Sequence, residues 1–304
     1  MRPAVQAKYL LQLTCLSALW GASFILTRIA VPQLGPNFSP WLRMTLGTLM
    51  LAIIMRVLKH RWPTEHWKEL MFIGFLAVAG PHALYSQAAL FLPGGYGALI
   101  SVTSVLFGAF ASAWLGEEVL TRGKLAGCLL GLAGAALVVR LGPAHPSAEL
   151  MLSALTCLGA AALSGIATPY LKRATTRMEP LAITAGMHAA SVLMLLPGAV
   201  HDFPNAHFTP SALAAVSVLG IATSGLAYWM FMRIMQHVPP MASMTANFMS
   251  TGFGVLWSVL LLGEATSLAM AVGGGLIVLA CLLVSNVNPL DLLRRADPKA
   301  EQDA

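Results

Sequence analysis

Leu115-Gly116-Glu117 closes a long apolar run of this 304-residue chain, and the same tripeptide closes a second run as Leu262-Gly263-Glu264, 147 residues later. The match continues on both sides of the tripeptide at the same offset. The equivalent pairs are Pro93 and Pro240, Phe110 and Trp257, Gly127 and Gly274, and Ala133 and Ala280. The chain therefore contains one hydrophobic unit written twice, a feature typical of transporters that bind their cargo between two repeats.

The composition is that of an integral membrane protein, with 57% hydrophobic residues, 10% charged residues and a mean hydropathy of +0.75. A helix needs roughly 20 apolar residues to cross the hydrocarbon of a bilayer. Ten such runs, joined by short polar segments, lie approximately at 9–31, 40–58, 69–91, 95–115, 122–141, 149–170, 180–200, 211–235, 240–262 and 267–287. We predict an all-α integral membrane protein whose ten transmembrane helices form two inverted five-helix repeats around a central cavity.

Lysine and arginine are spread unevenly over the predicted loops. No basic residue lies in the loops 32–39, 91–96, 142–148 and 201–210, and the positive-inside rule places these loops outside the cytoplasm. Both termini are then cytoplasmic, in a protein of the cell (inner) membrane, and the odd number of helices in each unit inverts the second unit. The predicted division is a first repeat at 1–141, a second at 149–287 and a cytoplasmic tail at 288–304. Because this asymmetry accounts for the net charge of +6, we expect no nucleic-acid partner.

Acidic residues are confined to tails, loops and helix ends, so no carboxylate is expected at mid-membrane. Exchange of protons for lipophilic cations usually needs a buried acid, and a strictly cationic substrate is therefore disfavoured. Coupling to protons would have to use a histidine or the substrate itself. The four cysteines are widely spaced, and metal-binding spacings, nucleophile elbows and phosphate-binding loops are absent, so we expect no cofactor, no metal and no ATP-driven transport.

The sequence Gly80-Pro81 lies near the middle of the third predicted helix. Proline removes a backbone donor and frees carbonyls that only protein or a hydrated cavity can satisfy, so this is the best pointer to a binding site. His82, Tyr85 and Ser86 follow on one helical face, and His188 lies deep in the seventh helix. Each histidine has two interpretations, as a cavity residue or as a hydrogen-bonded core residue.

Helices four and nine carry equivalent hydroxyl pairs, Thr103-Ser104 and Ser250-Thr251, and Asn247 shares a face with the second pair. Close helix packing and cavity lining are both open interpretations for these residues. Trp20 lies too far inside helix one for an interfacial belt, so we interpret it as a cavity wall or gate. Arg43, near the outer end of helix two, is either an interfacial anchor or an electrostatic guide at the exit.

Glycine-rich stretches mark helices five and ten, which lack polar residues at mid-span. We interpret both helices as scaffold, and we favour packing within the chain over a dimer face for their glycines. The expected state is a monomer or weak dimer. The glycines are Gly123, Gly127, Gly131, Gly134, Gly273, Gly274 and Gly275.

Several short motifs resemble the EamA-type ten-helix branch of the drug/metabolite transporter superfamily, over about residues 10–287. They are Trp20-Gly21-Ala22-Ser23-Phe24, Pro40 with Arg43, Gly97-Ala98, and Leu-Gly-Glu at the ends of helices four and nine. The resemblance implies that helices one to four and six to nine surround a central cavity, with helices five and ten outside. Many relatives also carry a proline near the middle of helices four and nine, which this chain lacks.

The chain is most similar to exporters of aromatic amino acids within that family. We therefore predict that it is not an enzyme but a secondary transporter or facilitator, which exports small metabolites, above all neutral and aromatic amino acids, by alternating access. Its expected partners are a small-molecule substrate and the lipid bilayer, with protons as the candidate coupling ion. The predicted substrate-binding residues are Trp20, Phe24, His82, Tyr85, Ser86, Ser104, Tyr228, Asn247 and Thr251, with Arg43 and His188 as electrostatic candidates.

Three alternatives remain open at this level, one of them a non-transporting receptor or scaffold, which the duplicated unit disfavours. The same fold can export a sugar, a nucleoside, an organic acid or a drug-like compound, and an organic anion would need an intramembrane cation, for which Arg28 and Arg43 are the candidates. A membrane-embedded enzyme using His82 or His188 would lack any visible nucleophile or metal set.

Overall fold

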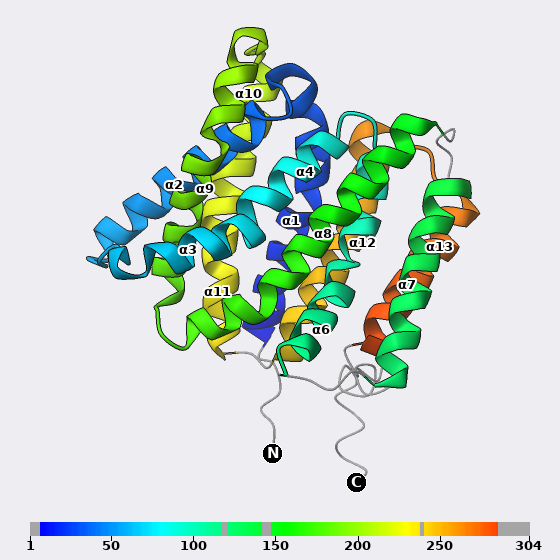
Figure 1. The fold of residues 1–304 in the computed structure, drawn as a ribbon. Helices are drawn as coiled ribbons and strands as arrows, with labels where there is room; N and C mark the ends of the chain where they lie inside the picture. Colours follow the sequence, from blue (N-terminus) through cyan, green and yellow to red (C-terminus); the bar gives the residue numbers. More distant parts are fainter. Residues whose placement is uncertain (1–6, 117–120, 142–146, 238–239, 285–304) are drawn as a thin grey trace.

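The computed structural model describes residues 7–116, 121–141, 147–237 and 240–284. Within these ranges the side chains at 7–10, 13, 124, 128, 135, 138–141, 234–237, 240–248, 281, 282 and 284 are outside the description. Throughout these ranges the chain is helical and contains no strand (Figure 1). The helices are α1 (Ala7–Leu34), α2 (Phe38–Val57), α3 (Trp67–Gly74), α4 (Gly80–Ala88), α5 (Gly94–Ser101), α6 (Ser104–Trp114), α7 (Arg122–Leu141), α8 (Ala148–Thr175), α9 (Pro180–Asp202), α10 (Pro210–Ser217), α11 (Ala227–His237), α12 (Pro240–Leu262) and α13 (Leu268–Val284). Two short 3-10 segments, η1 (Thr64–His66) and η3 (Phe203–Asn205), and two π-helical segments, η2 (Phe75–Ala79) and η4 (Val218–Leu226), complete the list.

Seven helical paths are long and apolar enough to cross a membrane: Thr14–Leu34, Phe38–Val57, Thr64–Ala88, Gly94–Trp114, Ala148–Thr175, Pro180–Asn205 and Pro210–Arg233. Three further apolar helical stretches, Leu125–Gly134, Met249–Leu262 and Leu268–Ala280, are shorter. The prediction of an all-helical, multi-pass membrane protein is confirmed. The count of ten spans and the inversion of the repeat stay predictions.

Helices α7 and α13 lie side by side at one edge of the molecule and pack mainly against each other (Figure 1). A side chain added at Gly134 would come within 2.7 Å of the Gly273 carbonyl oxygen, and one at Gly131 within 3.2 Å of Ala280 Cβ. Gly274 is equally close to Leu99 of α5. Gly131, Gly134 and Gly274 therefore pack against other parts of the chain, as predicted, whereas nothing among the described residues lies within 4 Å of a side chain added at Gly275.

The Leu-Gly-Glu tripeptide ends a helix in both places. Gly116 and Gly263 have φ angles of +72° and +62°, in the left-handed region that glycine adopts without steric cost and that commonly terminates helices. Glu264 then turns back to the start of α5, where its two carboxylate oxygens accept hydrogen bonds from the backbone amides of Gly94 (2.8 Å) and Gly95 (3.0 Å). Glu117 lies outside the described residues. The second tripeptide, Leu262-Gly263-Glu264, is thus a helix terminator followed by a cap for another helix.

Glycines also set the close crossing of α1, α12 and α5. A side chain at Gly21 would lie 2.8 Å from the backbone nitrogen of Gly254, and one at Gly254 would lie 2.5 Å from Ala98 Cβ. Small residues at such crossings let helix backbones approach in a membrane, where packing replaces the hydrophobic effect as the force that holds helices together.

Candidate functional site

Two stretches of π-helix interrupt otherwise α-helical paths, η2 before α4 and η4 between α10 and α11. π-Helical turns are rare and often lie at functional sites, because they leave the regular backbone hydrogen-bond pattern. Gly80-Pro81 directly follows η2, so the sequence located this irregular stretch correctly. Residues 222–226 of η4 are the counterparts of η2 at the 147-residue offset, and no proline marks them.

Arg43 of α2 points into η4 and is partly buried. Its Nε donates a hydrogen bond to Ser224 Oγ (2.8 Å), and Nη2 donates to Thr223 Oγ1 (3.2 Å). The two helices approach closely because Gly220 faces α2, where an added side chain would lie 2.8 Å from the Arg43 carbonyl oxygen. Within the part of the chain that the structure describes, Arg43 has no acidic partner.

Trp20 of α1 lies against the same segment. Its indole Nε1 donates to the carbonyl oxygen of Thr223 (3.3 Å), and its ring packs at 5.9 Å from Tyr228 and 4.8 Å from Phe231. His188 continues this aromatic surface, with its ring 5.5 Å from that of Tyr228. Four of the rings at this site therefore come from three helices, α1, α9 and α11.

Both histidines have one ring nitrogen fixed by a backbone carbonyl. Nδ1 of His188 donates to the Thr184 carbonyl (2.8 Å), and Nδ1 of His82 donates to the Val78 carbonyl in η2 (2.7 Å). A carbonyl can only accept, so Nδ1 carries the proton, and Nε2 of the neutral ring is an acceptor. His188 is almost fully buried at 1% exposure, whereas His82 is partly buried. His188 adjoins the Arg43 site, because a side chain added at Gly47 of α2 would lie 3.5 Å from His188 Cδ2 and 3.2 Å from Ser224 Cβ, and α4, which carries His82, packs on α2.

A second aromatic pair joins α1 to α4. The rings of Phe24 and Tyr85 meet edge to face at 5.7 Å, and Gly97 of α5 leaves room for Phe24, whose ring would otherwise lie 3.0 Å from a side chain there. Ser86 is buried on α4, one turn after His82. These predicted site residues therefore follow the α4 face that carries His82.

The other predicted residues lie at helix contacts or beyond the description. Thr251 of α12 is buried and donates to the Ala98 carbonyl of α5 (3.4 Å). Ser104 begins α6, where its backbone faces Gly165 of α8. The side chain of Asn247 lies outside the described residues. Three residues of the site were missed from the sequence: Thr223 and Ser224, which bind Arg43, and Phe231, which packs on Trp20.

Arg28, the second intramembrane cation, has a structural role. Its Nη1 donates to the carbonyl oxygens of Ala89 (2.5 Å) and Leu90 (2.6 Å), just beyond the end of α4. The last carbonyls of a helix lack partners within the helix, and Arg28 supplies one. Arg43, by contrast, is held by two hydroxyl groups beside the aromatic residues Trp20 and Tyr228.

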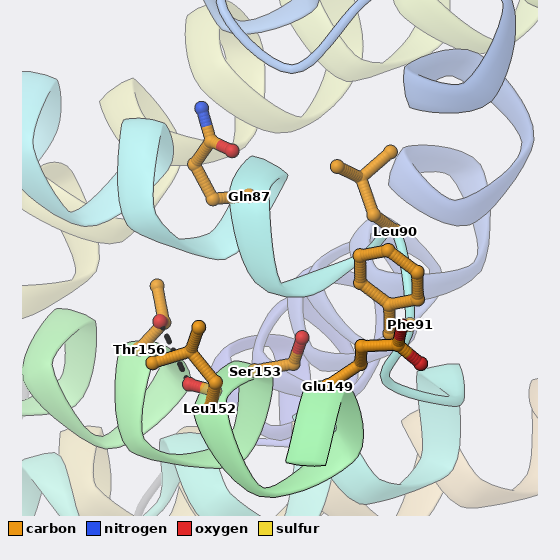
Figure 2. Close-up of a pocket in the computed structure, with 7 residues that line it drawn as sticks. All are labelled: Gln87, Leu90, Phe91, Glu149, Leu152, Ser153 and Thr156. Atoms are coloured by element: carbon orange, nitrogen blue, oxygen red, sulfur yellow. Dashed lines mark hydrogen bonds between the residues drawn. The ribbon is translucent and has the colours of Figure 1, made fainter. Parts of the chain in front are cut away.

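Figure 2 shows a separate pocket of about 160 Å³ between α4 and α8, lined by Gln87, Leu90, Phe91, Glu149, Leu152, Ser153 and Thr156. Two of its polar side chains are hydrogen-bonded within the protein: Thr156 donates to the Leu152 carbonyl (2.8 Å), and Gln87 turns away from α8 to donate to Asn37 (3.2 Å). None of the predicted site residues lines this pocket.

Comparison with known proteins identifies the family. The profile of the EamA-like transporter family matches residues 8–140 and again residues 151–286. A crystal structure that is 21% identical in sequence matches with a TM-score of 0.63, over 93% of this chain and 100% of that chain. That likeness concerns the fold.

Several curated proteins are similar along most of the chain. The uncharacterized transporter YvbV of Bacillus subtilis is 24% identical over 94% of this chain and 94% of its own length. An S-adenosylmethionine/S-adenosylhomocysteine transporter of Chlamydia trachomatis is 27% identical, covering 88% of this chain and 85% of that protein. A probable terminal-alkyne amino-acid exporter of Streptantibioticus cattleyicolor is 25% identical, covering 88% and 89%.

Proposed function

Because the chain belongs to the EamA-like transporter family, we propose that this multi-pass membrane transporter exports neutral amino acids, aromatic ones included, across the cell (inner) membrane. The observation that carries the proposal is the wall formed by Trp20, Tyr228, Phe231 and His188. Aromatic rings offer a large apolar surface and favourable edge or stacked contacts to another ring. No carboxylate is hydrogen-bonded to these side chains in the described part of the chain, which suits an uncharged substrate side chain.

The substrates named for relatives share the head group of an amino acid. S-adenosylmethionine, S-adenosylhomocysteine and a terminal-alkyne amino acid differ widely in their side groups, but all carry an α-amino and an α-carboxyl group. A transporter that holds this shared head group can accept different side chains by changes in the wall around it. We therefore place the aromatic wall against the side chain of the substrate.

The mechanism that we propose is alternating access between two inverted five-helix units. Packing supports this mechanism, because equivalent helices of the two units make equivalent contacts with the other unit. The first helix of each unit packs on the fourth of the other, α1 on α12 and α8 on α6. The third helix of each unit packs on the first of the other, α4 on α8 and the α10–η4–α11 path on α1. The equivalent helices α2 and α9 pack on each other, and so do α7 and α13. Such a two-fold arrangement lets one unit rock against the other about a site between them. The uneven distribution of lysine and arginine supports cytoplasmic termini.

An organic acid is the second candidate cargo, and Arg43 favours it, because an intramembrane cation without an acidic partner among the described residues attracts anions.

Transport by purified protein in proteoliposomes, preloaded with labelled solute, distinguishes an amino-acid cargo from an organic acid. The panel comprises phenylalanine, tyrosine, leucine, an aromatic carboxylic acid, a sugar and a nucleoside, each with and without an imposed pH gradient. We expect efflux of the amino acids above that of empty liposomes; efflux of the other solutes alone would refute the proposal. Acceleration by the gradient would identify protons as the coupling ion.

A further inference from the structure

We propose that Arg43 binds the α-carboxylate of the substrate while His82 and His188 accept hydrogen bonds from its α-ammonium group, so that the site requires a zwitterionic head group. This assignment rests on the proposed function, since it specifies how an amino acid is held. The assignment adds to the proposed function which part of the substrate is required and which residues recognise that part.

The first step is the arrangement of donors on Arg43. A guanidinium has five N–H groups, and the two hydrogen bonds to Ser224 and Thr223 use one on Nε and one on Nη2. The two N–H groups of Nη1 and the second one of Nη2 have no partner among the described residues. Nη1 and Nη2 can therefore donate two parallel hydrogen bonds, which is the geometry of a bidentate arginine–carboxylate pair.

The second step is how firmly the guanidinium is held. Ser224 and Thr223 are both 1% exposed, and the Thr223 hydroxyl also donates to the Leu219 carbonyl (2.6 Å). The Thr223 carbonyl accepts from Trp20. Arg43 is thus oriented before any ligand arrives, and it shares a hydrogen-bonding partner, Thr223, with Trp20 of the aromatic wall.

The third step concerns the histidines. Because Nδ1 of His82 and His188 is committed to a carbonyl, only Nε2 remains, and it accepts from a donor such as an ammonium group. His188 adjoins the arginine site directly, since a side chain added at Gly47 would lie 3.5 Å from His188 Cδ2 and 3.2 Å from Ser224 Cβ. A neutral acceptor suits a zwitterion, whose charges cancel, whereas a simple amine would bring a second cation beside Arg43 without compensation.

Competition in proteoliposomes tests the head group. Export of labelled phenylalanine is measured against phenylalanine, phenylalaninamide, phenethylamine and 3-phenylpropionate, which keep the ring but alter or remove one charged group each. We expect unlabelled phenylalanine to compete at least about tenfold better than any analogue, the difference expected for one charge-assisted hydrogen bond. Equal competition by phenylpropionate would refute the role of the histidines, and equal competition by phenylalaninamide would refute that of Arg43.

Variants assign the contact to Arg43. We expect Arg43→Gln to raise the half-saturating phenylalanine concentration by about tenfold to a hundredfold and to abolish the preference for phenylalanine over phenylalaninamide. Ser224→Ala removes only the hydroxyl that orients Nε, so it should raise the half-saturating phenylalanine concentration by a smaller factor. It also tests the contact if the Arg43→Gln protein does not fold. Arg56→Gln is the matched control, because Arg56 is exposed at the other end of the same helix.

The outcomes separate the two proposals. If the wild type exports phenylalanine and both Arg43→Gln and Ser224→Ala leave its affinity and its preference over the amide unchanged, the head-group assignment is wrong and the proposed function stands. If the wild type exports no amino acid, the proposed function is wrong. Binding of phenylalanine and the three analogues to purified protein, measured by calorimetry, then decides the head group independently of transport: preferential binding of phenylalanine supports it, and equal or absent binding overturns it.

Discussion

Trp20 combines two interactions that can be removed one at a time, its ring contacts with Tyr228 and Phe231 and its hydrogen bond to Thr223. An aromatic pair contributes about 0.5–1.5 kcal/mol beyond the burial of area, and a neutral hydrogen bond contributes a similar amount. Trp20→Phe keeps a ring and loses the N–H donor. We therefore expect the half-saturating concentration of phenylalanine to rise about two- to fivefold, as for the loss of one neutral hydrogen bond. Trp20→Ala loses both, and the rise should exceed about tenfold.

Trp114 provides the matched control for Trp20, because it is 84% exposed at the end of α6. Trp114→Ala should leave the half-saturating concentration of phenylalanine unchanged in the same proteoliposome measurement. If Trp20→Ala behaved like Trp114→Ala, the aromatic wall would not contact the substrate, and the amino-acid assignment would lose its main support.

Single residues also explain where sequence reasoning fell short. The long apolar runs and the irregular stretch at Gly80-Pro81 follow from local patterns of hydropathy and proline, whereas the separate position of the glycine-rich helices was implied by the family resemblance. The partners of Arg43 do not, because Thr223 and Ser224 lie about 180 positions away in sequence. Their one local signal is a pair of hydroxyls between Gly220 and Gly225 in an otherwise apolar run, which resembles ordinary helix packing.

At the scale of the helix, the carboxylate of Glu264 caps α5 from a distant part of the chain. A capping hydrogen bond contributes about 0.5–2 kcal/mol to the stability of a protein. A negative charge at a helix N-terminus adds about 0.3–1 kcal/mol through the helix dipole. Glu264→Gln keeps one acceptor oxygen and loses the charge, whereas Glu264→Ala loses both acceptors. We expect thermal unfolding in detergent to occur at progressively lower temperature in the order wild type, Gln variant, Ala variant.

The control for this cap is Glu65→Gln, at an exposed glutamate in η1. It should not shift the unfolding temperature by more than the scatter of the measurement. An unfolding temperature of Glu264→Ala equal to that of wild type would mean that the cap does not hold α5, and the explanation of why Leu-Gly-Glu recurs would then reduce to helix termination by its glycine.

Two glycines on α12 make a matched pair for testing helix packing. A side chain at Gly254 would lie 2.5 Å from Ala98 Cβ, whereas no atom of the described residues lies within 4 Å of one at Gly252. Alanine is favoured over glycine inside a helix by about 1 kcal/mol, so Gly252→Ala should be neutral or stabilising. Gly254→Ala must push α12 away from α5, and overpacking of this kind costs about 1–3 kcal/mol. Thermal unfolding of the two variants side by side checks the difference; equal stabilities would contradict the close crossing.

At the scale of the whole molecule, polar contacts tie the two proposed units together at both ends. At one end Asp202 accepts hydrogen bonds from the backbone amide (2.7 Å) and the side-chain amide (3.1 Å) of Asn37. At the other end Arg177 pairs with Glu69 at 2.7 Å, and Glu179 pairs with His60. Rocking of one unit against the other has to break one set while keeping the other. The relative strength of the Asp202 contacts and of the Arg177 and Glu179 contacts therefore determines which end of the site opens more often.

Weakening one set should shift this balance in a predictable direction. The Asp202 contacts are mostly shielded from solvent, so their loss in Asp202→Ala should favour opening at that end by about 1–3 kcal/mol, whereas the exposed Arg177 pair contributes only about 0.2–1 kcal/mol. The probe is Ser86→Cys, buried on α4, in a background whose native cysteines are replaced by alanine. A membrane-impermeant thiol reagent applied from outside should label it faster in Asp202→Ala and slightly more slowly in Arg177→Gln. Shifts in the same direction for both variants would contradict alternating access between these two ends, and faster labelling only from the cytoplasmic side would invert the proposed orientation.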